Sequence, residues 1–151
     1  MEKKIVSAVS TTLRLVLGAV FVYAGGLKVA DPNAFALQVE NYRILGHVPS
    51  VAMSLYLPYL EILCGLSLIF RTLYAGGLFL TGFLTLAFIA ALLSGWMRGL
   101  DIACGCFGSG DGRAHYGSAL LRDIAMLGIV AFLYQRLRRE AVTASALSSK
   151  Q

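Results

Sequence analysis

The segment from Leu73 to Gly95 has 23 residues and contains no charged side chain. As an α-helix it would rise about 35 Å, and the hydrocarbon core of a bilayer is about 30 Å thick. The whole chain is similarly apolar: 58% of its 151 residues are hydrophobic, 14% are charged, and the mean hydropathy is +0.73. Because a soluble domain carries about 25% charged residues, we predict an integral membrane protein.

Three further apolar segments have the length of a membrane-spanning helix, and the first of them, Val9 to Leu27, would rise about 28 Å. The sequence thus predicts an all-α membrane protein, a four-transmembrane-helix bundle that forms a single domain over residues 1–140. A small, polar tail follows, which we expect to be disordered. The predicted spans cover residues 9–27, 51–70, 73–95 and 119–135, the cysteine loop covers 98–118, and the tail covers 141–151.

A cleaved signal peptide is the alternative interpretation of the first span. Lys3 and Lys4 would form its basic start, and the small residues around Ala24 would permit cleavage. Arg14 argues against this interpretation because it would interrupt the apolar stretch.

One face of the first span carries Arg14, Gly18, Phe21, Gly25 and Lys28, which are spaced three or four residues apart. Small residues let a second helix approach closely, and charged residues in a membrane need partners. We expect this face to point into the bundle.

A short amphipathic segment separates the first two spans. Asp31 is a suitable N-cap, and Pro32 suits the first helical turn. From Asn33 to Leu45 apolar residues alternate with polar ones at helical spacing, and the segment is too short and polar to span. It predicts a helix that lies in the membrane interface.

Glu61 lies near the middle of the second span. An acid at this depth is costly, so it is normally protonated, paired or directed into a polar cavity. The length of an arginine side chain would allow Arg14 to reach it, and both structural pairing and proton handling remain open. Cys64, one turn further on, is interpreted as a small buried apolar residue.

The longest polar segment contains Cys104-Gly105-Cys106, with Asp101 three residues before the first thiol. Two thiols one residue apart can exchange electrons with another thiol pair, bind a soft metal, or close a structural disulfide. The spacing alone leaves these three functions open. Arg122 and Asp123 follow in the first turns of the fourth span, close to this loop.

The distribution of basic residues predicts the orientation. With four spans, the two termini and the turn at Arg71 share one side, and the basic residues near span ends are denser there than on the other side. We expect a multi-pass protein of the bacterial inner membrane with both termini in the cytoplasm and the cysteine loop outside it, where disulfides persist. The formal charge of +5 suits a lipid bilayer and not nucleic acid. The first side holds Lys3, Lys4, Arg71, Arg136, Arg138 and Arg139, and the second holds Lys28, Arg43, Arg98 and Arg113.

Motifs distributed over most of the chain resemble those of the MauE/DoxX family of redox-associated membrane proteins. One difference is that the acid usually found directly before the first cysteine is here Asp101, separated from it by two residues. The motifs are Tyr23-Ala24-Gly25-Gly26-Leu27-Lys28, Asp31-Pro32 with Phe35 and Tyr42, Pro58-Tyr59-Leu60-Glu61, Cys104-Gly105-Cys106-Phe107-Gly108, and Arg122-Asp123.

The resemblance implies a membrane thiol-disulfide redox protein that exchanges electrons with a thioredoxin-like partner outside the cytoplasm. Cys104 and Cys106 would be the exchanging pair of such an oxidoreductase, with Asp101 orienting their loop. If electrons continue into the membrane, a quinone between the helices is the natural acceptor. A homo-oligomer and a hetero-oligomer both stay open. The supporting polar residues would be Glu61, Lys28, Arg122 and Asp123 beneath the loop and Tyr42 at its rim.

Two alternatives belong to other classes of protein. In a soft-metal protein, Cys104 and Cys106 would capture Cu(I) or Hg(II), and Cys64 would receive the ion deeper in the bundle. In a structural subunit, the disulfide would only hold the loop together.

Overall fold

The computed structural model describes residues 2–41, 47–98 and 116–148, and the structural statements below concern these residues. They form helices only, which confirms the predicted all-α class. The helices are α1 (Glu2–Ala30), α2 (Pro32–Asn41), α3 (His47–Phe70), α4 (Tyr74–Met97) and α5 (Tyr116–Ser148).

Four of these helices are long and apolar enough to cross a membrane, as predicted. The helix surfaces also suit a lipid environment. Large apolar side chains such as Leu63, Phe79 and Leu121 point outward, where lipid would contact them, while Thr81 and Thr85 are buried. The protein is therefore a multi-pass membrane protein. The candidate spans are Lys4–Ala30, Pro49–Phe70, Tyr74–Met97 and Gly117–Val142.

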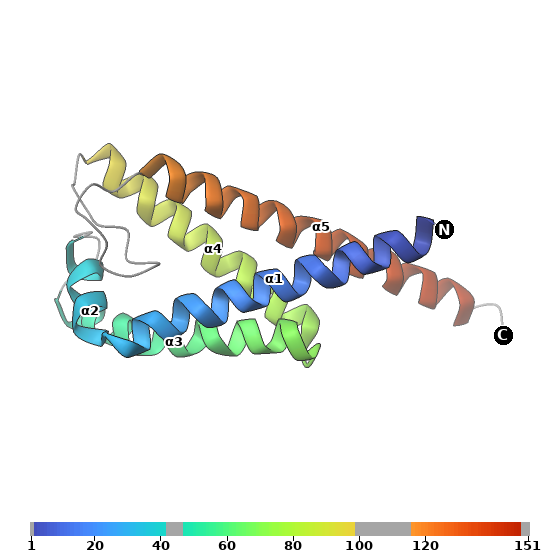
Figure 1. Cartoon of the computed structure of the whole chain (residues 1–151), viewed down its shortest axis with the longest axis horizontal. Helices are drawn as coiled ribbons and strands as arrows, with labels where there is room; N and C mark the ends of the chain where they lie inside the picture. Colours follow the sequence, from blue (N-terminus) through green and yellow to red (C-terminus); the bar gives the residue numbers. More distant parts are fainter. Residues whose placement is uncertain (1, 42–46, 99–115, 149–151) are drawn as a thin grey trace.

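The four long helices pack as two pairs, α1 with α3 and α4 with α5, and the turn between α3 and α4 links the pairs (Figure 1). Both termini and this turn lie toward one end of the bundle. The opposite end holds α2, the last turn of α4 and the first turn of α5. This end is called the α2 end below, and the other is called the terminal end.

Glycines set the close approach of α1 to α3. A Cβ atom on Gly18 would lie 2.8 Å from the carbonyl oxygen of Gly65, and one on Gly25 would lie 2.7 Å from the carbonyl oxygen of Pro58. The predicted inward face of α1 is thus confirmed. These contacts also fix the antiparallel register, which places Arg14 beside the last turn of α3 and Lys28 beside its middle.

The connection between α3 and α4 consists of three residues, and two of them have left-handed backbones: φ is 58° at Arg71 and 52° at Leu73. Left-handed residues reverse the chain within a short distance. This turn therefore makes α3 and α4 an antiparallel hairpin.

The helix α2 begins as the sequence predicted. A carboxylate oxygen of Asp31 accepts a hydrogen bond from the backbone N–H of Ala34 at 3.0 Å, which caps the helix. Phe35 is buried, and the helix packs mainly on α3. The described helix ends at Asn41, so residues 42–45 of the predicted amphipathic segment lie outside the described residues.

The helix α5 is longer than the sequence suggested, since it runs to Ser148 through most of the tail that we expected to be disordered. Alanine and leucine, which favour helix, recur between Ala141 and Leu147. These residues allow the helix to continue past the membrane segment.

Candidate functional site

A buried ion pair joins α1 to α3 near the α2 end. Nζ of Lys28 donates a hydrogen bond to Oε1 of Glu61 at 2.5 Å, and the two residues are 3% and 1% exposed. A charge in this position is costly unless it is paired. Glu61 is thus a paired intramembrane acid, one of the options that its position predicted.

Two aromatic rings complete the surroundings of the Lys28 ammonium. It lies 4.6 Å from the ring centroid of Phe88 on α4 and 5.1 Å from that of Phe35 on α2. The negative face of an aromatic ring attracts a cation. Lys28 therefore connects three helices besides its own: α2, α3 and α4.

A second charged pair comes from the start of α5. Nε and Nη2 of Arg122 donate hydrogen bonds to Oδ1 of Asp123 at 3.0 and 2.8 Å. The Asp123 side chain is buried, whereas that of Arg122 is 30% exposed. The other oxygen, Oδ2 of Asp123, is buried and accepts no hydrogen bond from the residues that the structure describes.

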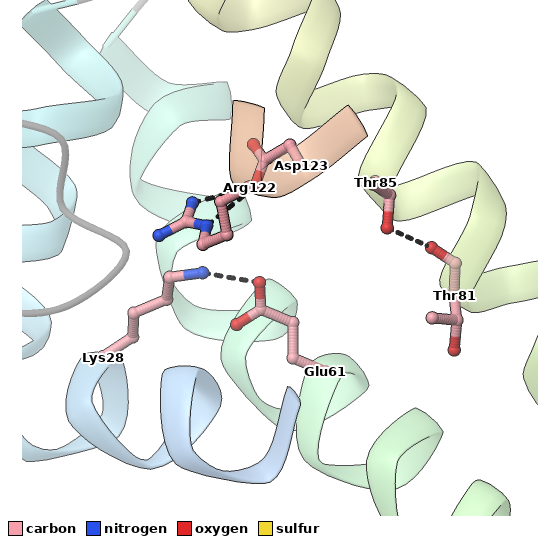
Figure 2. A network of polar contacts seen from close by, with 6 residues as sticks. All are labelled: Lys28, Glu61, Thr81, Thr85, Arg122 and Asp123. Atoms are coloured by element: carbon pink, nitrogen blue, oxygen red, sulfur yellow. Dashed lines mark hydrogen bonds and ion pairs between the residues drawn. The ribbon is translucent and has the colours of Figure 1, made fainter. Parts of the chain in front are cut away.

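The two pairs border one small cavity of about 30 Å³, which has room for about one or two water molecules. Figure 2 shows the Arg122 guanidinium above the Lys28–Glu61 pair, with Thr85 of α4 to one side. Thr85 also lines the cavity, and its hydroxyl donates to the carbonyl oxygen of Thr81 at 2.8 Å. We call Lys28, Glu61, Arg122 and Asp123 the charge cluster.

The charge cluster is balanced, with two cations and two carboxylates. Its residues come from three helices that are far apart in sequence, so a change in helix packing would separate the charges. The arrangement can hold polar groups or water at the α2 end of an otherwise apolar bundle, and Oδ2 of Asp123 can accept a proton or a hydrogen bond.

The four supporting residues of the prediction that lie in described segments do come together, since they are the charge cluster. The other predicted site residues are Cys104, Cys106, Asp101 and Tyr42, and they lie outside the described residues. The cluster lies at the end of the bundle where α4 ends and α5 begins, and so where the cysteine segment joins both helices (Figure 1).

Cys64 belongs to the hydrophobic core and is 2% exposed. This agrees with its interpretation as a small buried residue. Within the described segments, no group of three or more His, Cys, Asp and Glu side chains could hold a metal ion.

The expected approach of Arg14 to Glu61 is wrong, because Lys28 takes that place. The register of α1 on α3 places Arg14 about ten residues, or about 15 Å, from the level of Glu61. Equal depths of the two spans in the membrane would have brought Arg14 within reach of Glu61, but the observed register offsets them. Arg14 lies instead over the ring of Tyr74, 6.0 Å from its centroid, near the terminal end.

Sequence reasoning did not identify Phe88 and Thr85 as neighbours of the charge cluster. Both occur in the span without charged residues, where an aromatic or a threonine is unremarkable. The available signal was their spacing of three residues, which places them on one helix face, but only the packing of α4 shows that this face meets Lys28.

Comparison with known proteins gives a match to the family described as "Methylamine utilisation protein MauE", which covers residues 6–136. The chain belongs to the MauE family. Among curated proteins, this MauE-family chain is similar to the methylamine utilization protein MauE of Paracoccus denitrificans, with 33% identity over 118 residues.

That alignment covers 78% of the present chain and 63% of the relative, so the chain spans less than two thirds of the relative's length. No solved structure matches the chain. The family match covers most of α1, all of α2 to α4 and the larger part of α5, and therefore the whole charge cluster.

Proposed function

We propose that this MauE-family protein is a membrane thiol-disulfide redox protein that exchanges electrons with a thioredoxin-like partner through Cys104 and Cys106. The observation that carries the proposal is the cavity of the charge cluster, whose lining includes Asp123, a residue with a buried Oδ2 atom. It lies at the bundle end where the cysteine segment joins α4 and α5.

The proposed step balances without a further reactant. A thiolate of the Cys104–Cys106 pair attacks the partner's disulfide, forms a mixed disulfide and releases one partner thiolate. The second cysteine then resolves the mixed disulfide. The pair loses two electrons and two protons as it becomes a disulfide, and the partner takes up both as it becomes a dithiol. The reverse reaction follows the same path.

The charge cluster supports this chemistry by position and by protonation. The Lys28–Glu61 pair holds α1 to α3 below the attachment points of the cysteine segment. The free acceptor of Asp123 takes up a proton or a hydrogen bond from that segment. Because α5 carries both Asp123 and one end of the segment, a change at one affects the other.

The orientation proposed for the chain places the α2 end outside the cytoplasm, in a bacterial inner membrane with both termini inside. It rests on the basic residues at the terminal end and on the chemistry, since disulfides form and persist outside the cytoplasm. The relative's name refers to methylamine utilization. We propose that the present chain serves the same process by its thiol chemistry.

A quinone does not fit the described cavity. The space inside the charge cluster has about 30 Å³, whereas small-molecule sites have about 300–1,000 Å³. No step is therefore assigned to a quinone.

A redox titration of the full-length protein in detergent tests the proposal. Thiols are alkylated at potentials between about −120 and −320 mV and counted by intact mass. Two thiols should disappear together at one potential, and peptide mapping should link Cys104 to Cys106. A thioredoxin without its resolving cysteine should then form a mixed disulfide with the protein. A pair that stays reduced throughout this range would contradict the proposal.

Two variants give the control and the test of the cluster. In Cys64→Ala the same two thiols should disappear at an unchanged potential. Asp123→Asn keeps the shape of the side chain but removes the carboxylate, and it should shift the potential of the pair or slow mixed-disulfide formation. If Asp123→Asn changes neither while the cysteine pair still titrates, the charge cluster does not take part in the exchange.

Nothing in the described segments favours the soft-metal alternative. It requires Cys64 as the inner acceptor, but Cys64 is packed among Leu17, Leu68 and Leu78. Cu(I) added to the reduced protein provides the test: alkylation protection of Cys104 and Cys106 that depends on Cys64 would favour metal transfer.

A further inference from the structure

A second polar hollow lies at the terminal end, opposite the charge cluster. It has a volume of about 80 Å³ and is bordered by Arg14 of α1, Arg71 of the α3–α4 turn, Tyr74 of α4 and Arg136 and Glu140 of α5. Three guanidinium groups thus meet one carboxylate. We call this hollow the arginine pocket.

The arginines converge although they come from three separate parts of the chain. Arg14 and Arg71 both lie over the Tyr74 ring, 6.0 and 5.8 Å from its centroid. Arg136 donates hydrogen bonds to the carbonyl oxygen of Val6 at 2.7 Å and to Oγ of Ser10 at 3.3 Å. Tyr74 and α1 therefore hold the three cations around one space.

The acid in this pocket compensates little of that charge. Glu140 is 59% exposed and lies 3.7 Å from Arg136, a distance and exposure at which an ion pair contributes little. Nη1 of Arg14 is buried and has no hydrogen-bond acceptor among the described residues. A buried guanidinium nitrogen without an acceptor is costly, and an anion bound in the pocket would supply that acceptor.

We propose that the arginine pocket binds a phosphate group, either the phosphodiester of an anionic lipid or inorganic phosphate. Arginine donates in a planar fork that matches phosphate oxygens, and several arginines around one anion are typical of phosphate sites. This site is independent of the thiol chemistry, because it lies at the other end of the bundle.

The depth of the pocket suits a lipid headgroup. Arg71 and Tyr74 lie where two candidate spans end and begin, since these are Pro49–Phe70 and Tyr74–Met97. The boundary of a span is the level of the lipid phosphates. Basic pockets between membrane helices also bind anionic headgroups in general.

The test uses the full-length protein in detergent and in nanodiscs. The probes are phosphatidylglycerol, phosphatidylcholine as the zwitterionic control, and sodium phosphate against sodium chloride at equal ionic strength. Retained lipid is measured by native mass spectrometry, and binding is also measured as the rise in melting temperature. The protein should retain phosphatidylglycerol in preference to phosphatidylcholine.

Variants separate the pocket from a general effect of positive charge. Arg14→Gln and Arg71→Gln should each weaken binding by about tenfold, the cost of one charge-assisted hydrogen bond. Arg138→Gln removes the same charge from an exposed position beside Tyr134, outside the pocket, and should change binding by less than about twofold. Arg14→Lys, which keeps the charge but loses the fork, should give an intermediate value.

Each outcome either supports the proposed phosphate site or overturns it. Selective retention of phosphatidylglycerol that depends on Arg14 and Arg71 supports a lipid headgroup. A rise in melting temperature with sodium phosphate alone, lost in the same variants, supports a soluble phosphate. Equal weakening by Arg138→Gln, or binding of neither probe, overturns the proposal. If Arg14→Gln does not fold, Arg71→Gln at the exposed turn decides the question.

Discussion

At the α2 end the four residues of the charge cluster neutralise one another, whereas at the terminal end three arginines face one exposed carboxylate. The first site has a volume of about 30 Å³, and its central pair is almost fully buried. The second has a volume of about 80 Å³, and Nη1 of Arg14 finds no acceptor there among the described residues.

The difference between the two sites shows that charged side chains in a membrane bundle can serve two purposes. Paired charges of opposite sign need no external group, so the charge cluster can hold the helices in register. An excess of one sign needs a counterion from outside, so the arginine pocket is suited to binding. The predictions below test whether the two sites differ in this manner.

The largest effect is expected at the charge cluster. Lys28→Met removes the cation of the buried Lys28–Glu61 pair, which should destabilise the protein by about 3–5 kcal/mol. The double variant Lys28→Met/Glu61→Leu should recover most of this loss, because an apolar pair carries no desolvation cost. Thermal unfolding in detergent measures both. If Lys28→Met were as stable as the native protein, the Lys28–Glu61 ion pair would not form as the structure shows it.

A smaller effect is expected at the α1–α3 interface, whose register sets which charges meet. A Cβ atom on Gly65 would lie 2.6 Å from the carbonyl oxygen of Gly18, so Gly65→Ala should destabilise by about 1–3 kcal/mol. Gly128→Ala is the matched control, because nothing lies within 4 Å of its added Cβ. This control should be neutral or stabilise by up to about 1 kcal/mol. Similar losses in both variants would argue against the close approach.

Cys64→Ala should have a moderate effect, since it leaves only a small space in the core. The expected loss is about 1 kcal/mol, the contribution of a small apolar group. The number of thiols that titrate with Cys104 and Cys106 should stay the same. A change in that number would show that thiol chemistry extends from the α2 end into the core.

The smallest effect on stability should come from Glu140→Gln at the arginine pocket. The exposed pair with Arg136 contributes about 0–0.5 kcal/mol, so the melting temperature without phosphate should hardly move. Binding of phosphatidylglycerol or phosphate should become tighter, because the variant removes the carboxylate that opposes the anion. Weaker binding in Glu140→Gln would contradict the role assigned to the three arginines.

Much of the site could be predicted from local pattern. The cost of an acid in the membrane identified Glu61, and helical spacing placed Lys28 on the inward face of α1. The partner of Glu61 could not be predicted, because it depends on the register of two helices. A shift of a few residues along α1 would place another side chain beside Glu61 instead of Lys28, and no local sequence pattern specifies that register.

The arginine pocket was not predicted at all. Local pattern predicts Glu61 as the partner of Arg14, which is wrong, and it predicts only a cytoplasmic position for Arg71 and Arg136. Their convergence on one pocket requires the left-handed turn at Arg71 and the contact of α5 with α1. Neither follows from the composition of any one segment.

The sequence by itself determined that the chain crosses a membrane four times, which residues of each span are polar, and that two thiols lie in one connection. Hydropathy and helical periodicity are local properties, so they can be read along the chain. The tertiary structure decided which charges neutralise one another and which remain in excess. That outcome depends on distances between helices far apart in sequence, and these are set by glycine contacts and turn geometry.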